Sequence, residues 1–259
     1  YGFSVMSINT VLAGFFAVGP LLWGGLYTLN DWTDWQKDKL HAVKKFRPIP
    51  SGEVSPTLAL IFSILLILGS IAIAFALNNF LFLICIIAML ANQILYTLKP
   101  FELKKKPVVD LISGSLINPI FRFYSGWILT VSAFNAPLEI IAFIVLTQFG
   151  AYTAYRLASK KHDQEQKYKS SVVVFSERTL KIIAYAAVAI GLSAFVFSIY
   201  TKVLETKFLW IIILSLFTLP FYLKALKDPQ KMDMKKVYNA IYLHYLAAII
   251  MFFIIGYYF

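Results

Sequence analysis

The sequence predicts an all-helical protein, a polytopic bundle of transmembrane helices. Hydrophobic residues make up 59% of the 259 residues and charged residues only 14%, whereas soluble domains carry about 25% charged residues. Mean hydropathy is +0.73, and several apolar runs approach or exceed the roughly 20 residues that cross a bilayer as a helix. The single cysteine, Cys85, lies inside one of these runs. Neither a disulfide within the chain nor a cysteine-based metal site is therefore expected.

Apolar segments account for most of the chain, and we expect them to form one transmembrane domain over residues 1–259. Three of them begin close to Pro56, Pro107 or Pro137, where the missing proline N–H costs a helix least. Because the chain begins at Tyr1 and shows no signal-peptide pattern, we expect N-terminal sequence to be missing, up to a whole helix. The eight candidate helices cover about residues 4–29, 57–77, 80–98, 108–131, 137–158, 179–200, 208–223 and 238–258.

The linkers between these segments alternate between long, basic ones and short ones. Of the 24 Lys and Arg residues, 21 lie in the long linkers or at their edges, which places the long linkers in the cytoplasm by the positive-inside rule. The net charge of +11 is thus mostly a topology signal, and we expect no nucleic-acid partner, although basic linkers also suit phosphate-bearing substrates. The long linkers are residues 30–55, 99–106, 156–178 and 224–236, and the short ones are 78–79, 132–136 and 201–207.

An acidic cluster stands where the first apolar segment ends. Asn30, Asp34 and Asp38 are spaced four apart, so a continuing helix would present them on one face. Asp31, three residues before Asp34, joins that face from the side. Such a cluster repels itself unless a cation binds, and hard oxygen ligands that leave room for water and phosphate suit Mg²⁺. We therefore predict that these residues bind magnesium, with Asp34 and Asp38 acting in catalysis.

Basic residues follow the acidic cluster within a few positions, namely Lys44, Lys45 and Arg47. A metal on the carboxylates and cations beside it would hold a diphosphate from two sides. The alternative is a solvated, charged loop that merely obeys the topology rule. Four metal-capable residues in helical register at a membrane boundary favour the diphosphate site.

The Asn-Asp-x-x-Asp-x-x-x-Asp pattern of residues 30–38, followed by Arg-Pro-Ile-Pro-Ser-Gly at residues 47–52, closely resembles the first signature of the UbiA superfamily of intramembrane prenyltransferases. The resemblance covers essentially the whole chain. It implies nine helices around a central cavity capped by cytosolic linkers, eight of them in this chain. It also implies magnesium-dependent transfer of an isoprenyl group from a prenyl diphosphate to a lipid or aromatic acceptor, with membrane lipids as further partners.

Two further stretches support the resemblance. The stretch Tyr96-Thr97-Leu98-Lys99 resembles the family's Tyr-(Ser/Thr)-x-x-Lys, with one residue fewer before the lysine. Lys99 could snorkel to a phosphate; an ordinary cytoplasmic lysine is the alternative. Arg122 lies inside an apolar segment, and a charge there usually faces a cavity or a partner. We predict a site role for Arg122 in catalysis or phosphate binding. Asp110 lies on the same helix face. The alternative to a site role for Asp110 is an ion pair with a nearby lysine, such as Lys106.

The second linker departs from the family's second acidic motif. It carries only Asp163 and Glu165 as carboxylates, with Lys167 at the position where another acid is expected. We predict that Asp163 still holds one metal and takes part in catalysis, but a second full acidic site cannot be built. The linker is instead cationic, and its predicted diphosphate ligands are Arg156, Lys160 and Lys161.

This departure leaves the donor open. The Lys161-His162-Asp163 stretch and the segment 171–176 resemble the branch that transfers phosphoribosyl to a polyprenyl phosphate, as in decaprenyl-phosphate phosphoribosyltransferase. Phosphoribosyl diphosphate carries an additional 5-phosphate, which a cationic linker would suit. Prenyl diphosphate and phosphoribosyl diphosphate therefore both remain as donors. A cation-binding transporter is the alternative of another class, but transport sites tend to lie near mid-membrane on broken helices, whereas these carboxylates stand at a helix end.

Overall fold

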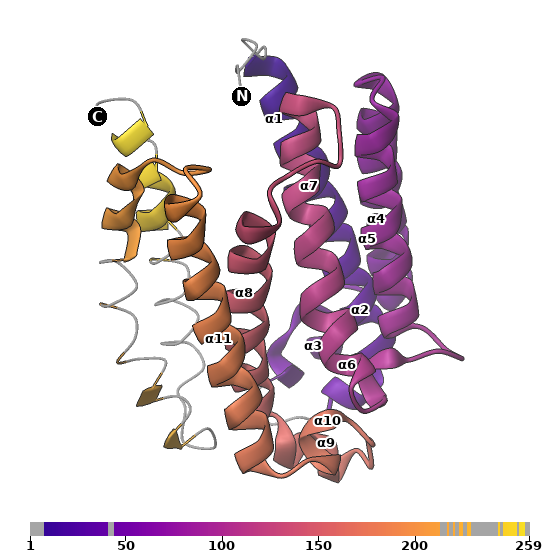
Figure 1. Cartoon of the computed structure of the whole chain (residues 1–259). Coiled ribbons are helices and arrows are strands. Elements are labelled where there is room, and N and C mark those ends of the chain that lie inside the picture. The colour runs from indigo at the N-terminus through magenta and orange to yellow at the C-terminus, as the bar shows by residue number, and fades with distance from the viewer. Residues whose placement is uncertain are drawn as a thin grey trace. The chain divides into compact units, whose positions relative to one another are not determined.

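The computed structural model describes residues 8–40 and 44–212, together with 217, 220, 223–224, 227–228, 243, 246–252 and 254–256. The described part is all-helical, as predicted (Figure 1). Its α-helices are α1 Ile8–Phe16, α2 Gly24–Asp38, α3 Pro48–Ser51, α4 Pro56–Ala76, α5 Phe80–Thr97, α6 Val109–Ile112, α7 Asn118–Val131, α8 Leu138–Ala158, α9 Lys160–Glu165, α10 Ser171–Val174 and α11 Glu177–Tyr200. Two π-helical stretches, η1 Ala17–Trp23 and η4 Ser113–Ile117, and three 3₁₀ turns, η2 Lys44–Phe46, η3 Leu103–Lys105 and η5 Thr206–Leu209, connect them.

Five helical runs of the described residues are long and apolar enough to cross a membrane, which identifies an integral membrane protein. The predicted segment 108–131 also forms a helical run, through α6, η4 and α7, but it is not one of the five. Asp110, Asn118 and Arg122 interrupt its apolar character. About half of each of the predicted segments 208–223 and 238–258 lies outside the described residues, and residues 246–252 and 254–256 are helical. The five runs are Ile8–Asp38, Pro56–Ala76, Phe80–Thr97, Leu138–Ala158 and Glu177–Tyr200.

The first helical run extends nine residues beyond residue 29, where the predicted apolar segment ends, and includes the whole acidic cluster. Pro20 lies inside it, in the π-helical stretch η1. Proline cannot donate the usual helical hydrogen bond, and a local π turn is one way in which a helix accommodates that loss. The prediction that a continuing helix carries residues 30–38 is therefore confirmed.

The chain divides into two compact units, each with its own apolar core. Unit 1 comprises Tyr1–Lys104 and Ile117–Ala136. Within it, α2 packs closely against α4 at Gly25, which has no side chain. Any larger residue there would place its Cβ 3.0 Å from the carbonyl oxygen of Ser63. The Ser63 hydroxyl donates to the Gly25 carbonyl at 2.8 Å. This hydrogen bond links the two helices five residues before Asn30, the first member of the acidic cluster.

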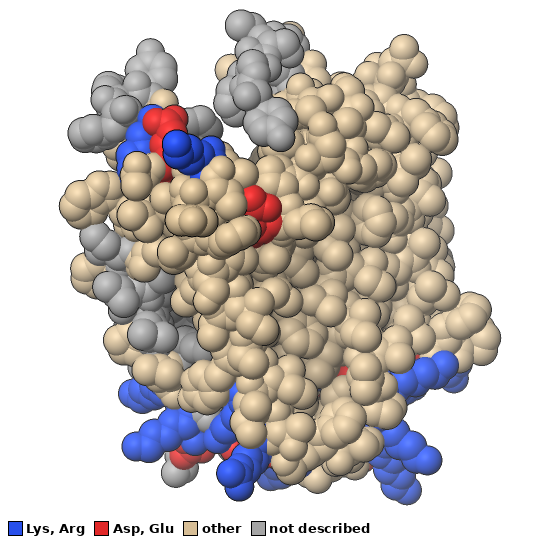
Figure 2. Space-filling view, viewed as in Figure 1, with Lys and Arg blue, Asp and Glu red and all other residues tan. Residues whose placement is uncertain are grey.

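Unit 2 comprises Lys105–Leu116 and Pro137–Phe259. Its described centre is the pair α8 and α11, which pack closely at Gly150, where an added Cβ would stand 2.7 Å from the carbonyl oxygen of Ala184. The short helices α9 and α10 follow α8 and precede α11. On the face that Figure 2 shows, Lys, Arg, Asp and Glu side chains gather toward the helix ends, and the middle of that face is apolar, because charged side chains in contact with lipid are costly.

Candidate functional site

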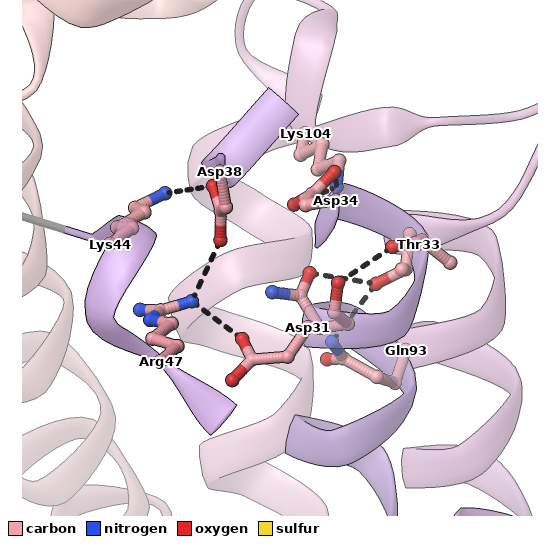
Figure 3. A network of polar contacts seen from close by, with 10 residues as sticks. Asp31, Thr33, Asp34, Asp38, Lys44, Arg47, Gln93 and Lys104 are labelled. Carbon is pink, nitrogen blue, oxygen red and sulfur yellow. Dashed lines mark hydrogen bonds and ion pairs between the residues drawn. The ribbon is translucent and has the colours of Figure 1, made fainter. Parts of the chain in front are cut away.

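The last turns of α2 carry the acidic cluster of unit 1, and Arg47 lies between two of its carboxylates (Figure 3). The Arg47 Nη1 donates to Asp31 Oδ1 at 2.6 Å and to Asp38 Oδ2 at 3.2 Å. Lys44 Nζ lies 3.5 Å from the other Asp38 oxygen. Asp38 is only 2% exposed, so its charge depends on these two cations for compensation.

The conformation of the loop after α2 places Arg47 beside Asp31 and Asp38. Arg47 has an extended backbone and precedes Pro48, which opens the one-turn helix α3. Ile49 is buried and anchors this turn. Gly52 ends α3 with φ +88°, a left-handed conformation that strains any residue with a Cβ. The Arg-Pro-Ile-Pro-Ser-Gly stretch is therefore a rigid turn after the acidic helix, and the next long helix begins only at Pro56.

Asp34 has a different partner, Lys104, which sequence reasoning missed. Lys104 Nζ lies 2.8 Å from both carboxylate oxygens of Asp34, and Lys104 is only 9% exposed. In Figure 3 it approaches Asp34 from a different direction than Arg47 approaches Asp31 and Asp38. Lys99, which the sequence predicted as a phosphate ligand, is exposed in the turn after α5. The sequence does show a run of three lysines at residues 104–106. It does not show which of the three contacts the acidic cluster, because that depends on the burial of Lys104 in the folded protein.

Asn30, the first member of the cluster, is linked to α5. Thr97 Oγ1 donates to Asn30 Oδ1 at 3.5 Å, and Gln93 Nε2 donates to Thr97 Oγ1 at 3.1 Å. Gln93 and Thr97 are both buried, so this chain orients the Asn30 amide. Lys45, by contrast, is exposed and lies 5.0 Å over the ring of Phe46.

The residues on α2 fit a magnesium ion that a diphosphate helps to hold. Within the described ranges, no three His, Cys, Asp or Glu side chains are arranged to hold an ion by themselves. Asp31 and Asp38 nevertheless converge on a single cationic nitrogen of Arg47. Mg²⁺ is usually bound through one or two carboxylates plus substrate phosphates. This donor set, with Asp34 and Asn30 on the same helix face, matches that requirement, and the metal assignment itself stays a prediction.

The second linker forms a buried polar network in unit 2. Asp163, 2% exposed, accepts from Arg156 Nη2 at 2.6 Å and from the Ser170 hydroxyl at 2.5 Å. Asp110, fully buried, accepts from the backbone N–H of Ser171 at 3.0 Å and from its hydroxyl. Arg156 Nη2 lies 3.7 Å from Asp110 as well. Asp110 thus pairs with Arg156 and Ser171, and the network joins α6, α8, α9 and α10.

The remaining predicted residues lie apart from these contacts. Lys160 is half-buried and Lys161 exposed at the start of α9. Arg122 is exposed on α7, with its guanidinium carbon 4.4 Å over the ring of Trp23. Their assigned roles, like that of Lys99, stay predictions.

Comparison with known proteins identifies the family. The model of the UbiA prenyltransferase family matches residues 3–257. Digeranylgeranylglyceryl phosphate synthase from Methanothrix thermoacetophila is 30% identical over 141 residues, covering 54% of this chain and 50% of that protein. Decaprenyl-phosphate phosphoribosyltransferase from Mycobacterium tuberculosis is 32% identical over 132 residues, covering 47% of this chain and 42% of that protein. The chain thus spans half or less of the length of these two relatives.

A solved structure shows the same fold. The UbiA homolog from Archaeoglobus fulgidus, bound to GPP and Mg²⁺, superposes with a TM-score of 0.76 over 98% of this chain and 91% of that chain, at 18% sequence identity. The predicted fold class and the predicted family resemblance are both confirmed.

Proposed function

This chain belongs to the UbiA prenyltransferase family, and on that premise we propose that it is a magnesium-dependent membrane transferase. It moves an isoprenyl group from a prenyl diphosphate to a lipid or aromatic acceptor and releases diphosphate. One observation carries the proposal: each of the three carboxylates on α2 is matched by a cation from a following linker, Arg47 for Asp31 and Asp38, and Lys104 for Asp34.

The side chains of unit 1 divide the work. Asp31, Asp34, Asp38 and Asn30 would hold Mg²⁺, which supplies positive charge that stabilises the departing diphosphate. Arg47, Lys44 and Lys104 place N–H donors beside the carboxylates, where phosphate oxygens bound to the same ion would lie within reach. The carbon–oxygen bond of the donor breaks with carbocation character, and the acceptor nucleophile attacks that carbon. The apolar helices keep the isoprenoid chain and the cation away from water.

Phosphoribosyl transfer to a polyprenyl phosphate is the second candidate, and the second linker favours it. Asp163 is held by Arg156 and Ser170, and the linker offers Lys160 and Lys161 in place of further acids. An additional 5-phosphate would need such cations. The similarity to the mycobacterial phosphoribosyltransferase supports this candidate, and the similarity to the synthase from Methanothrix thermoacetophila supports prenyl transfer.

The positive-inside rule supports a cytoplasmic position for the site. Family membership and the location of the carboxylates in the last turns of α2 support a transferase over a cation transporter, whose sites tend to lie near mid-membrane.

Donor selection tests the proposal. Purified protein in membranes receives Mg²⁺ and either geranylgeranyl diphosphate or phosphoribosyl diphosphate, and diphosphate release and the mass of the lipid product are measured. Prenyl transfer predicts a product heavier by one isoprenyl chain. A product heavier by phosphoribosyl selects the second candidate. Cation flux into liposomes without consumption of either donor would overturn both.

A further inference from the structure

Arg122 and Trp23 meet in unit 1, away from the acidic cluster. Gly14 lies next to Leu129, and Trp23 lies next to Arg122. Residue numbers therefore rise along the first helical run while they fall along α7, so the two helices are antiparallel. Asn30 lies seven residues beyond Trp23, or about 10 Å along the axis of α2. The Arg122–Trp23 pair therefore lies deeper in the helical span than the acidic cluster.

Two buried polar atoms near this pair have no hydrogen-bond partner. The indole nitrogen of Trp23 and the amide oxygen of Asn118 are both buried and unsatisfied, and Asn118 is only 4% exposed. Asn118 precedes Arg122 by four residues, so it lies one turn, about 6 Å, away on the same face. Given the antiparallel packing, that turn lies toward the acidic cluster. An unsatisfied buried donor or acceptor destabilises the protein, and a bound ligand that pairs with it would remove that penalty.

Two glycines, each one turn from a member of the pair, leave open space on the opposite side. Gly126, one turn after Arg122, and Gly19, one turn before Trp23, have nothing within 4 Å of an added Cβ. Both lie on the side away from the acidic cluster because the helices run antiparallel. Arg122 is itself an exposed residue. A charged side chain exposed within an apolar helical run is costly against lipid and is usually directed at a ligand, a partner or a water-filled space.

We propose that Arg122, Trp23 and Asn118 form a binding site for the phosphate headgroup of an amphiphilic acceptor. A phosphate monoester complements the three groups: its anionic oxygens suit the guanidinium and the unsatisfied indole N–H, and its singly protonated form offers a hydroxyl to the unsatisfied Asn118 oxygen. The space beside Gly19 and Gly126 receives the start of its alkyl chain. The inference rests on the proposed function, since it names the acceptor class of that transferase.

Binding without magnesium separates this site from the donor site. The full chain in phosphatidylcholine nanodiscs with EDTA is titrated with hexadecyl phosphate, hexadecanol or inorganic phosphate, and tryptophan fluorescence is followed. We expect hexadecyl phosphate to bind at least about tenfold more tightly than either other probe, the scale of one charge-assisted hydrogen bond. Equal binding of hexadecanol would overturn the anion site, and equal binding of inorganic phosphate would overturn the lipid headgroup.

Substitutions assign the binding to these residues. Arg122→Gln should weaken hexadecyl phosphate about tenfold or more, whereas Arg122→Lys should retain part of the preference. Trp23→Phe keeps the ring but removes the N–H, and Asn118→Asp adds repulsion, so both should weaken binding with binding stoichiometry preserved. Arg178→Gln, at an exposed arginine on α11, is the matched control. Unchanged affinity in Arg122→Gln would overturn this inference, whereas the proposed function would stand. Retained anion binding in a protein that consumes no donor would instead overturn the proposed function.

Discussion

Asp38 is the most buried carboxylate on α2, and two neighbouring cations, Arg47 and Lys44, compensate its negative charge. Asp38 is 2% exposed and lies against Arg47 and Lys44. Breaking a buried pair leaves an uncompensated charge, which costs far more than the pair contributes. At the residue scale, the site is thus a set of balanced charges that a metal and a diphosphate would rearrange together.

Removing a carboxylate of α2 should abolish magnesium-dependent turnover. We expect Asp34→Ala and Asp38→Ala to lower turnover by about a hundredfold or more, the loss typical of one preorganised charge-stabilising group. EDTA should have the same effect on the unaltered protein. The measurement is diphosphate release at varied Mg²⁺, with the exposed Glu53→Ala as control. Full activity in both variants would remove the metal proposal.

We expect Lys104 to contribute more to binding of the donor diphosphate than its neighbours Lys105 and Lys106. Its ammonium group lies 2.8 Å from both oxygens of Asp34, so Lys104→Met removes a charge-assisted contact. We expect the KM for the donor to rise about tenfold, measured by steady-state kinetics at saturating Mg²⁺. Lys106→Met, at an exposed position, should change little. A larger loss in Lys99→Met than in Lys104→Met would favour the ligand predicted from sequence.

At the scale of elements, the sequence predicted most of the long helices within a few residues. Residues 57–77, 80–98 and 137–158 correspond to α4, α5 and α8, because a bilayer demands uninterrupted apolar length. The apolar segment ends at residue 29, because hydropathy falls at Asn30, whereas the helix continues to Asp38, as the four-residue spacing of the acidic cluster predicted. Polar residues end an apolar pattern, but they do not end a helix.

Close helix packing in unit 2 depends on Gly150. An added methyl group would stand 2.7 Å from the Ala184 carbonyl oxygen, so Gly150→Ala forces α8 and α11 apart. Overpacking of this kind costs about 1–3 kcal/mol, and we expect a lower melting temperature in detergent. Gly69→Ala is the control, because its new methyl would make only ordinary contact with Leu21. Equal melting temperatures for the two variants would contradict this packing.

The buried network of the second linker should act on stability. Asp163 accepts from Arg156 and Ser170, so Asp163→Ala leaves a largely buried guanidinium undercompensated. We expect a loss of about 3 kcal/mol, or about 6 °C or more in melting temperature for a chain of this size. Glu165→Ala, at an exposed position, is the control. A weaker Mg²⁺ dependence at unchanged melting temperature would instead support the predicted metal role of Asp163.

At the scale of the whole molecule, the charge pattern predicts which linkers face the cytoplasm. The buried Cys85 can be replaced by Ala, and single cysteines introduced as Glu53→Cys and Glu205→Cys, both at exposed positions. A membrane-impermeant maleimide should label Glu205→Cys on intact cells and Glu53→Cys only after permeabilisation, because the long basic linkers stay inside. The reverse labelling pattern would invert the topology.

The sequence by itself determined the membrane class, most helical segments and the family motif, because all of these depend on local composition and short-range spacing. Only the tertiary structure decided which cation meets which carboxylate. Arg47 and Lys104 reach their partners across 16 and 70 residues of chain, and such pairings depend on the path of the loops and on burial. The same holds for Asp163, whose pairing with Arg156 and Ser170 follows from the folding of α9 and α10 against the end of α8.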